Sequence, residues 1–312
     1  MDTNKQKYKK VCEENDSVPF FLHYNWYNTL FSENDWGVVV EEQNNKVVGF
    51  IPYYITKKMK FKVIVPPALT PYQGVWLNYN SEQKYTNRLS FEKKVMTSLI
   101  NQLPKTDAFK QKFYPEITNW LPFYWKGYTQ TTRYTYILND ISNTENLFTE
   151  FRENIRREIR KAEKSLSIES LSSVDELYEL KVKTYLEQKD NYPFSLSLLK
   201  KVFGYCLENN CGELLAAKDK DGNIHSIILY VWDKNCAYYL HGVTNPDFKT
   251  TGSMSLLLWE AIKRSSSKTT AFNFEGSMIE PIERYFRAFG GQQTPYFEIS
   301  KTSSQLLKML NY

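Results

Sequence analysis

One stretch near the C-terminus decides how this chain is interpreted: FNFEGSMIEPIERYFRAFGGQQTPYFEI, from Phe272 to Ile299. It begins as a strand-like run that ends on Glu275 and continues with aromatic residues at helical spacing. The helical pattern stops at Gly290-Gly291, and a second strand-like run follows. Because glycine readily adopts the positive φ that ends a helix, the stretch predicts a strand, a helix and a returning strand.

Parts of this stretch recur 163 positions earlier in the chain. At this spacing, six residues of the first half are identical to residues of the second half, beginning with Ala108 and Ala271. The six in the first half are Ala108, Phe109, Phe123, Gly127, Gln130 and Thr131. Upstream, WGVVVEEQNNKVVGFIPYYI aligns with CGELLAAKDKDGNIHSIILYVW at a step of about 177, which brings Tyr53 onto Tyr230. Because the two matching blocks occur in the same order in both halves, the sequence predicts two copies of one fold. The alternative is that both halves only use common β-turn-β patterns.

Each half has the same order of expected elements: a strand, a polar turn, two strands, a helix, a strand, a helix and a strand. The polar turns, Asn44-Asn45 and Asp221-Gly222, are strong hairpin signals. Their order predicts an α/β fold in which each half is a mixed, mostly antiparallel sheet flanked by helices. We place the two domains at residues 1–145 and 146–312. The principal segments are 38–42, 47–55, 61–65, 91–103, 108–113 and 133–138, then 213–218, 224–232, 237–243, 253–265, 270–274 and 296–300.

A basic amphipathic helix is expected over residues 147–166, LFTEFRENIRREIRKAEKSL, and is counted with the second domain. Its apolar residues recur at spacings of three and four from Leu147 to Leu166. Arginines and lysines interleaved with glutamates occupy the other faces. Most of these charges are expected to form a solvated face with ion pairs. Alternatively, some arginines face a phosphorylated ligand.

Composition bounds the partners and the location of the protein. A net charge of +5 and a pI near 8.7 are compatible with a phosphate-bearing ligand and give no indication of DNA binding. No apolar run approaches the roughly 20 residues of a membrane span and no basic-then-apolar leader opens the chain, so we expect no membrane span and a cytoplasmic location. The four cysteines form no CxxC pair and are expected to be reduced structural thiols, and with only three histidines no metal site is expected.

Two titratable residues are candidates for acid–base chemistry. Strand alternation is expected to place Tyr239 and His241 on one face. If their strand neighbours the one that ends at Glu275, then His241 and Glu275 meet at the same end of the sheet. An imidazole near neutral pH could accept a proton from an attacking amine. The alternative is a histidine that is hydrogen-bonded inside the fold.

The loop Lys249-Thr250-Thr251-Gly252-Ser253 directly precedes the apolar helical run MSLLLWEAIKR. The first N–H groups of a helix lack partners and the helix dipole favours an anion, so this loop is a plausible phosphate site. The same residues would also serve as an ordinary N-cap.

This strand, loop and helix resemble the acyl-CoA pyrophosphate loop of the GNAT N-acyltransferases. Two such halves joined by Arg152-Glu153-Asn154-Ile155 and by Ile159–Lys164 resemble the Fem-type and acetyltransferase 6 proteins, which have tandem GNAT-like domains. The segment Tyr285–Gly291 is similar to their F-K-x-x-F-G pattern. The resemblance spans nearly the whole chain and is strongest from about residue 130 onward.

The resemblance implies an N-acyltransferase that moves an acyl group from an acyl-CoA, such as acetyl-CoA, to an amine without a metal ion. The acceptor would be an amino sugar or a cell-envelope precursor. One alternative is a Fem-type aminoacyltransferase that uses charged tRNA on a peptidoglycan precursor. Another is a catalytically silent relative that binds a glycan.

Three groups of site residues follow from the patterns and the resemblance together. We expect catalysis by Glu275, His241 and Arg287, the last neutralising a donor phosphate or a developing oxyanion. We expect the donor to bind Lys249, Thr251, Gly252 and Ser253. We expect the acceptor to bind Tyr72, Gln73, Trp76, Tyr239 and Ser277.

Overall fold

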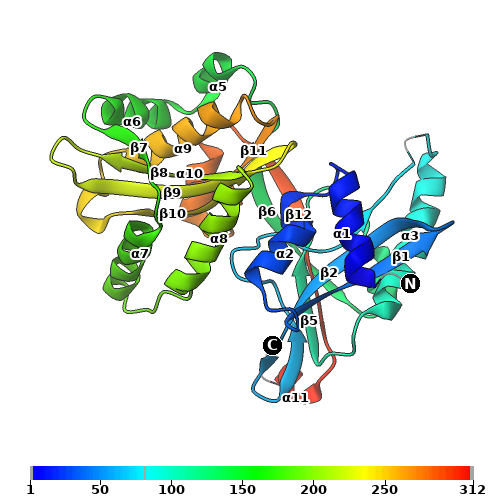
Figure 1. Cartoon of the computed structure of the whole chain (residues 1–312). Coiled ribbons are helices and arrows are strands. Elements are labelled where there is room, and N and C mark those ends of the chain that lie inside the picture. Colours follow the sequence, from blue (N-terminus) through cyan, green and yellow to red (C-terminus); the bar gives the residue numbers. More distant parts are fainter. Residues whose placement is uncertain (1–2, 81, 310–312) are drawn as a thin grey trace. The chain divides into compact units, whose positions relative to one another are not determined.

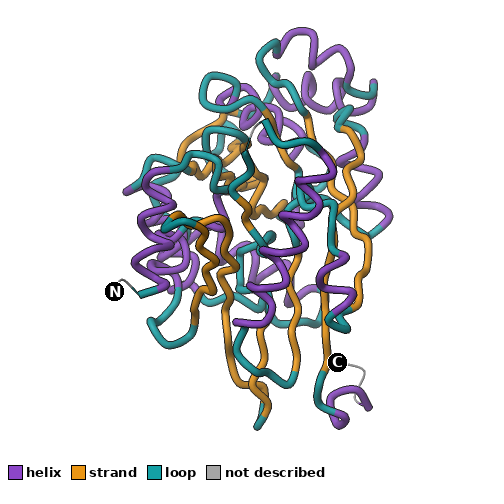
Figure 2. Tube along the Cα trace, turned by 90° about the vertical axis from the view of Figure 1, so that its right-hand side faces the viewer, coloured by secondary structure: helices purple, strands orange, loops and turns teal. Residues whose placement is uncertain are grey.

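The computed structural model describes residues 3–80 and 82–309. The chain divides into two compact units (Figure 1). Unit 1 comprises Met1–Arg133 and Pro295–Tyr312, and unit 2 comprises Tyr134–Thr294. Helices pack alongside the strands of both units (Figure 2).

Unit 1 contains a mixed sheet with the strand order β1-β2-β3-β5-β12, and β4 is added to β2. The β1-β2-β3 strands and the β5-β12 pair are antiparallel, whereas β3 and β5 are parallel. The strands are β1 (Trp36–Gln43), β2 (Lys46–Lys58), β3 (Phe61–Ile64), β4 (Trp76–Leu77), β5 (Ala108–Lys112) and the C-terminal part of β12 (Gln292–Thr302). The helices are α1 (Asn4–Glu14), η1 (Phe20–Leu22), α2 (Tyr24–Leu30), α3 (Tyr85–Gln102), α4 (Leu121–Trp125) and α11 (Gln305–Met309).

Local chemistry explains the first hairpin and the helix that covers it. The β1–β2 turn uses Asn44 and Asn45 at φ values of 51° and 61°, the left-handed conformation that a two-residue hairpin turn requires and that asparagine tolerates. One face of α3 buries Val95 and Leu99 in a cluster with Ile51 of β2. This packing joins helix and sheet into the core of unit 1.

The strands of unit 2 have the order β7-β8-β9-β10-β11-β6, and their pairing is also mixed. Only the β10–β11 pair is parallel among the described strand pairs of this unit. The strands are β6 (Thr129–Leu138, from Tyr134 onward), β7 (Ser167–Ser170), β8 (Gly212–Lys218), β9 (Ile224–Trp232), β10 (Cys236–Thr244) and β11 (Ala271–Asn273). The helices are α5 (Thr144–Glu150), α6 (Glu153–Glu163), α7 (Asp175–Glu187), α8 (Leu196–Glu208), η2 (Pro246–Phe248), α9 (Ser253–Ser265) and α10 (Glu280–Arg287).

Helices cover both faces of the unit 2 sheet. α6 and α9 lie on one face, and α7 and α8 lie on the other (Figure 1). Consequently β9 is buried along nearly its whole length, which explains its continuous apolar run IILYVW. Ile155, Ile159 and Ala162 of α6 pack with α9 in the main cluster of this unit.

The order of strand pairing is the same in both units. Two antiparallel pairs, one parallel pair and one antiparallel pair follow one another in β1-β2-β3-β5-β12 and in β8-β9-β10-β11-β6. Ala108 and Ala271 begin β5 and β11, and Gly127 and Gly290 have φ values of 75° and 78°. The prediction of two copies of one mixed sheet is therefore confirmed.

The boundary between the units differs from the expected division at residues 145 and 146. The chain leaves unit 1 within β6 and returns to it within β12. Ile137 and Leu138 of β6 pair with β11 in unit 2, and Glu298–Thr302 of β12 pair with β5 in unit 1. The last strand of each sequence half therefore pairs with a strand of the other half, which hydrophobic periodicity cannot reveal.

The expected helix over residues 147–166 is in fact two helices, α5 and α6. Phe151 and Arg152 separate them with extended backbone, at ψ values of 145° and 147°. Phe151 is buried between Trp259 and Phe289, and the N–H of Arg152 donates to the carbonyl of Ala288 at 2.9 Å. Tertiary packing thus breaks a helix that the apolar spacing alone predicts as continuous.

None of the helices within 3–80 and 82–309 has the length and apolar character needed to cross a membrane. In the same part of the chain, no group of three or more His, Cys, Asp or Glu residues is arranged to hold a metal ion.

Candidate functional site

A cavity of about 320 Å³ lies at the N-terminus of α9 in unit 2. It contains three of the four residues predicted to bind a donor, Lys249, Gly252 and Ser253. The fourth, Thr251, lies beside it and donates its hydroxyl to the carbonyl of Phe248 at 2.9 Å. The other lining residues are Glu158, Thr244, Thr250, Met254, Ser255 and Tyr285.

Gly252 shapes this cavity because it caps α9 in the left-handed conformation, at φ 77°. A Cβ at this position would lie 2.7 Å from the carbonyl oxygen of Glu158, so any side chain would collide with backbone. The first helical hydrogen bond runs from the N–H of Leu256 to the carbonyl of Gly252 at 3.0 Å. The preceding N–H groups, from Ser253 to Ser255, therefore have no partner within the helix and make its end attractive to an anion.

The hydroxyl of Ser253 is part of a buried network. Its Oγ lies 2.7 Å from the Oγ of Ser226, which in turn donates to Oγ1 of Thr244 at 3.0 Å. These bonds fix the start of α9 to β9 and β10. The Ser253 side chain therefore orients the loop, and its backbone N–H is the group suited to a ligand.

The cavity lining also contains a carboxylate and a phenol that the sequence patterns did not indicate. Ser255 donates to Oε2 of Glu158 at 2.7 Å, and its Oγ lies 2.8 Å from the Tyr285 hydroxyl. Burial raises the pKa of Tyr285, so its phenol is a neutral hydrogen-bonding group at neutral pH.

β10 contains a bulge that changes the expected arrangement of Tyr239 and His241. Tyr239 pairs with Tyr230 and His241 pairs with Leu229, so Leu240 is the extra residue. Tyr239 consequently packs toward Phe286 of α10, with ring centroids 5.9 Å apart, and His241 faces Tyr192 on the other side. The prediction that Tyr239 and His241 share one face is wrong, because the bulge interrupts the alternation.

His241 lies in an aromatic cluster. Its Nε2 is 2.6 Å from the Tyr192 hydroxyl, and its ring also contacts Phe194. Burial, together with the positive charge of Lys181, lowers the pKa of His241 to about 3. Burial also lowers the pKa of Lys181 to about 8. His241 is thus neutral at physiological pH and a weak base, which favours the alternative of a histidine hydrogen-bonded inside the fold.

Glu275 lies just beyond β11, where the chain turns sharply. Glu275 and Gly276 both have positive φ, at 62° and 57°. A Cβ on Gly276 would lie 2.3 Å from the carbonyl oxygen of Tyr134, so glycine is required there. The N–H of Glu275 donates to Oδ1 of Asn273 at 2.8 Å, and its side chain is half-buried. A carboxylate held at an uncommon φ is a reasonable site hypothesis.

Ser277 and Arg287 have partners within the protein. The Oγ of Ser277 accepts from the N–H of Ile279 at 3.0 Å, just before α10. Arg287 donates from Nε to Oε1 of Glu283 at 3.0 Å on the same helix, and its side chain is 45% exposed. Their predicted roles with a substrate stay predictions.

The three acceptor residues predicted in the first half are core residues of unit 1. Tyr72 packs on Tyr114 and Tyr296, at 4.9 and 5.2 Å between ring centroids. Gln73 donates from its N–H to the carbonyl of Lys112 at 2.6 Å, and Trp76 stacks on Phe50 at 4.9 Å. All three are at most 5% exposed, so packing within the unit explains them.

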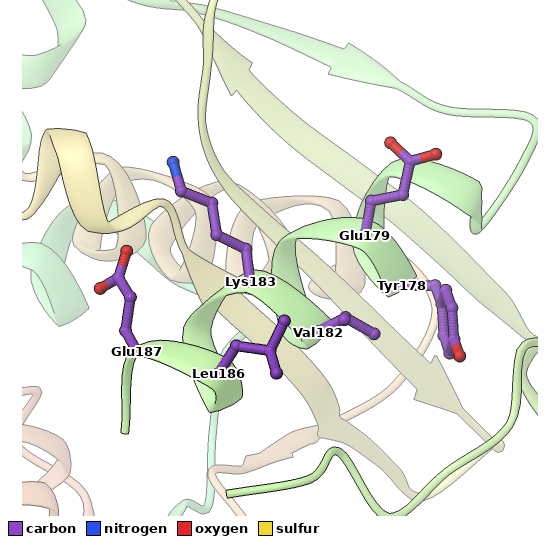
Figure 3. Close-up of a pocket in the computed structure, with 6 residues that line it drawn as sticks. All are labelled: Tyr178, Glu179, Val182, Lys183, Leu186 and Glu187. Carbon is purple, nitrogen blue, oxygen red and sulfur yellow. The ribbon is translucent and has the colours of Figure 1, made fainter. Parts of the chain in front are cut away.

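A groove of about 620 Å³ follows α7 (Figure 3). Tyr178, Val182 and Leu186 form its apolar stripe, and its charged lining residues are Glu179, Lys183 and Glu187. Lys183 forms an ion pair with Asp247 at 2.6 Å. Because Asp247 belongs to η2, directly before the loop at α9, this pair links the groove to the cavity loop.

Residues 149–275, which contain the cavity loop and Glu158, match a known family model. The matched family is described as an acetyltransferase (GNAT) domain. The expected resemblance to GNAT proteins is therefore confirmed for this part of the chain.

Solved structures extend this resemblance to the fold of nearly the whole chain. FemX matches with a TM-score of 0.64 at 12% identity, over 95% of this chain and 96% of FemX. The C-terminal domain assigned to a lysylphosphatidylglycerol synthetase of Agrobacterium fabrum matches with a TM-score of 0.56 at 13% identity, over 98% and 94% of the two chains. A tandem GNAT protein from the clavulanic acid biosynthesis pathway matches with a TM-score of 0.53 at 10% identity, over 88% and 85%. No curated protein sequence gives a match. The tandem GNAT-like fold is thus confirmed, and these identities carry no statement about substrates.

Proposed function

We propose that the chain is an N-acyltransferase that takes its acyl group from an acyl-CoA bound at the α9 cavity. The observation that carries the proposal is the juxtaposition of Lys249, the left-handed Gly252 and the first N–H groups of α9 in one cavity. A diphosphate needs such backbone donors together with a cation. The match of residues 149–275 to an acetyltransferase domain supports the same assignment.

The strands beside the cavity suggest where the acyl group lies. Pairing between β10 and β11 ends at Tyr238 and Asn273, although β10 continues to Thr244 at the cavity. The donor would run from the α9 N-terminus along this part of β10. The bulge at Leu240 alters the direction of the backbone groups next to the point where the strands part.

The proposed reaction is direct attack of an amine on the thioester carbonyl. The amine nitrogen forms the new C–N bond, and the C–S bond breaks as the tetrahedral intermediate collapses. Glu275 accepts the proton that the amine loses, and the departing thiolate takes a proton from water. The products are an amide and CoA, and Glu275 returns to the carboxylate by releasing its proton to water.

The α7 groove is the proposed acceptor surface. Its apolar stripe suits an acceptor with an apolar body, and Glu179 and Glu187 complement an ammonium group. An acceptor amine is protonated before reaction, so it would be attracted to these carboxylates. An amino sugar or a cell-envelope precursor carrying an amine remains the proposed substrate class.

One observation favours charged tRNA as an alternative donor. Glu158 places a carboxylate in the cavity wall and weakens its attraction for a diphosphate. A donor without a diphosphate at this position, such as an aminoacyl ester, avoids this repulsion. Such an enzyme would be a Fem-type aminoacyltransferase.

Thermal-shift measurements on the full chain with acetyl-CoA, CoA or charged tRNA test the donor. A ligand at 100 times its dissociation constant adds roughly 2.7 kcal/mol of stability. We expect CoA to stabilise the protein, and Lys249→Ala to weaken that effect. Lys220→Ala, at an exposed turn of the same unit, is the control. Stabilisation by tRNA alone would favour the alternative, and stabilisation by CoA that is equal in both variants would refute the assigned cavity.

A further inference from the structure

The end of α8 brings two cysteines together. Asn210 has a positive φ of 48°, and its N–H donates to the carbonyl of Leu207 at 3.3 Å. The N–H of Cys211 donates to the carbonyl of Cys206 at 3.0 Å. These two bonds form a Schellman motif, in which the residue after the left-handed one contacts the residue five positions earlier. The motif therefore pairs Cys206 with Cys211, although their sequence spacing is not a known redox motif.

The thiol of Cys211 also influences the ionisation of the Cys206 thiol. The next residue, Gly212, leaves room for Cys206, because a Cβ there would lie 2.8 Å from both Cβ and Sγ of Cys206. On the other side, the N–H of Trp232 donates to the carbonyl of Cys211 at 2.9 Å. Both cysteines are thus held in place by β8 and β9.

We propose that Cys206 and Cys211 are an oxidation site that closes to a reversible disulfide in the presence of a hydroperoxide. A disulfide needs Cα atoms about 4.4–6.8 Å apart, and a direct backbone hydrogen bond between the two residues is compatible with that separation. Cys206 is fully buried, whereas Cys211 is half-buried and is the thiol that an oxidant reaches first.

The chemistry balances with hydrogen peroxide as the oxidant. The Cys211 thiol is oxidised to a sulfenic acid while peroxide is reduced to water. The Cys206 sulfur then attacks the Cys211 sulfur, the S–S bond forms, and a second water leaves with the sulfenic oxygen and the Cys206 proton. An added dithiol reverses the reaction by thiol–disulfide exchange.

The environment of Cys206 determines the rate. The hydrogen bond to Cys211, together with burial, raises the pKa of the Cys206 thiol well above its usual value. Because the thiolate is the nucleophile, closure is slow at neutral pH and accelerates by up to about tenfold per pH unit as the pH rises. The attack of Cys206 on the oxidised Cys211 should therefore become faster as the pH rises.

The test is mass spectrometry of the full chain after treatment with hydrogen peroxide and digestion without reduction. We expect a species that is lighter by two hydrogens and in which Cys206 and Cys211 are cross-linked. It should form faster at pH 9 than at pH 7, and dithiothreitol should convert it back to the dithiol. Cys211→Ser should abolish this species, and Cys206→Ser should do the same where it folds. Cys236→Ser, which removes a half-buried cysteine elsewhere in unit 2, should leave it unchanged. Absence of the cross-link in the wild type, or a cross-link through Cys12 or Cys236, would overturn the proposal.

Discussion

Gly252 and Glu158 fit against each other so closely that no side chain is possible at residue 252. The carbonyl oxygen of Glu158 lies 2.7 Å from the position that a Cβ on Gly252 would take. The two residues come from α6 and from the cap of α9, so this contact sets the distance between the two helices at the cavity. Cavity shape and helix packing therefore depend on the same glycine.

Gly252→Ala should lower both the stability of the protein and its affinity for a donor. The left-handed φ costs about 1–2 kcal/mol for a residue with a Cβ, and the collision with Glu158 adds about 1–3 kcal/mol. Gly222→Ala is the matched control, because Gly222 has φ 85° and open space around it. Urea unfolding should show a loss of only about 1–2 kcal/mol for the control. Equal losses in both variants would contradict the close packing at Gly252.

Tyr285→Phe tests the phenol in the wall of the proposed donor cavity. It keeps the ring that packs on Phe289 and removes only the hydroxyl. We expect its affinity for CoA to fall about 2–10-fold, because a hydrogen bond contributes roughly 0.5–1.5 kcal/mol net. The matched variant is Ser255→Ala, which removes the hydrogen-bond partner but keeps the phenol and should cost less. Wild-type affinity for CoA in a binding titration of Tyr285→Phe would exclude the phenol from the donor site.

Much of the fold could be predicted because its signals are local. The helix expected over 253–265 matches α9, since a glycine cap and a regular apolar spacing mark its ends. The partners of β6 and β12 could not be predicted. Each of these strands pairs with a strand of the other sequence half, and such pairing leaves no trace in hydrophobic periodicity. The break at Phe151 was hidden for a similar reason: tertiary contacts with Trp259 and Phe289, not local propensity, end α5.

The candidate site also contains some residues that local sequence signals indicate and others that they do not. Lys249, Gly252 and Ser253 could be found because a helix N-terminus and a glycine are local signals. Glu158 and Ser255 are 97 residues apart, so no pattern along the chain shows their hydrogen bond. The bulge at Leu240 adds a single residue to one strand, and alternation in sequence gives no warning of it. Tyr239 and His241 were therefore placed together although they lie on opposite faces.

Met59→Gly should stabilise the protein. Met59 connects β2 to β3 with φ 55°, and it is 86% exposed, so its side chain contributes little packing. Removing the left-handed strain should outweigh the larger entropy of glycine in the unfolded chain, for a net gain of roughly 0.5–1 kcal/mol. Lys60→Gly, one residue on and without a positive φ, should destabilise by a similar amount. Chemical denaturation of the two variants checks this, and a loss of stability in both would refute the strain argument.

His241 should make unit 2 sensitive to acid. Its pKa is about 3 in the folded protein, against 6.5 as its ordinary value. Above pH 6.5 the imidazole is neutral in both the folded and the unfolded protein. Below pH 6.5 it binds a proton in the unfolded protein but stays neutral in the folded protein. Stability therefore falls as the pH drops from 6.5 toward 3, by about 2–3 kcal/mol at pH 4.5. His241→Gln keeps an acceptor for Tyr192 and cannot titrate, so urea unfolding at pH 7 and 4.5 should show a smaller loss. An equal loss in wild type and variant would refute the assignment.

Glu275→Gln separates a catalytic carboxylate from a structural one. Glutamine has nearly the same shape and is subject to the same strain at the positive φ of 62°, so the fold and donor binding should be retained. If the carboxylate accepts the proton of the acceptor amine, turnover should fall at least ~10²-fold, the lower range for a general base. A residue that only supports the turn before α10 would lose little activity as glutamine. Acyl transfer measured beside the melting temperature distinguishes the two cases. Near-wild-type turnover at an unchanged melting temperature would remove Glu275 from the mechanism, and since His241 is a weak base, the amine would then have to lose its proton to another group or to solvent.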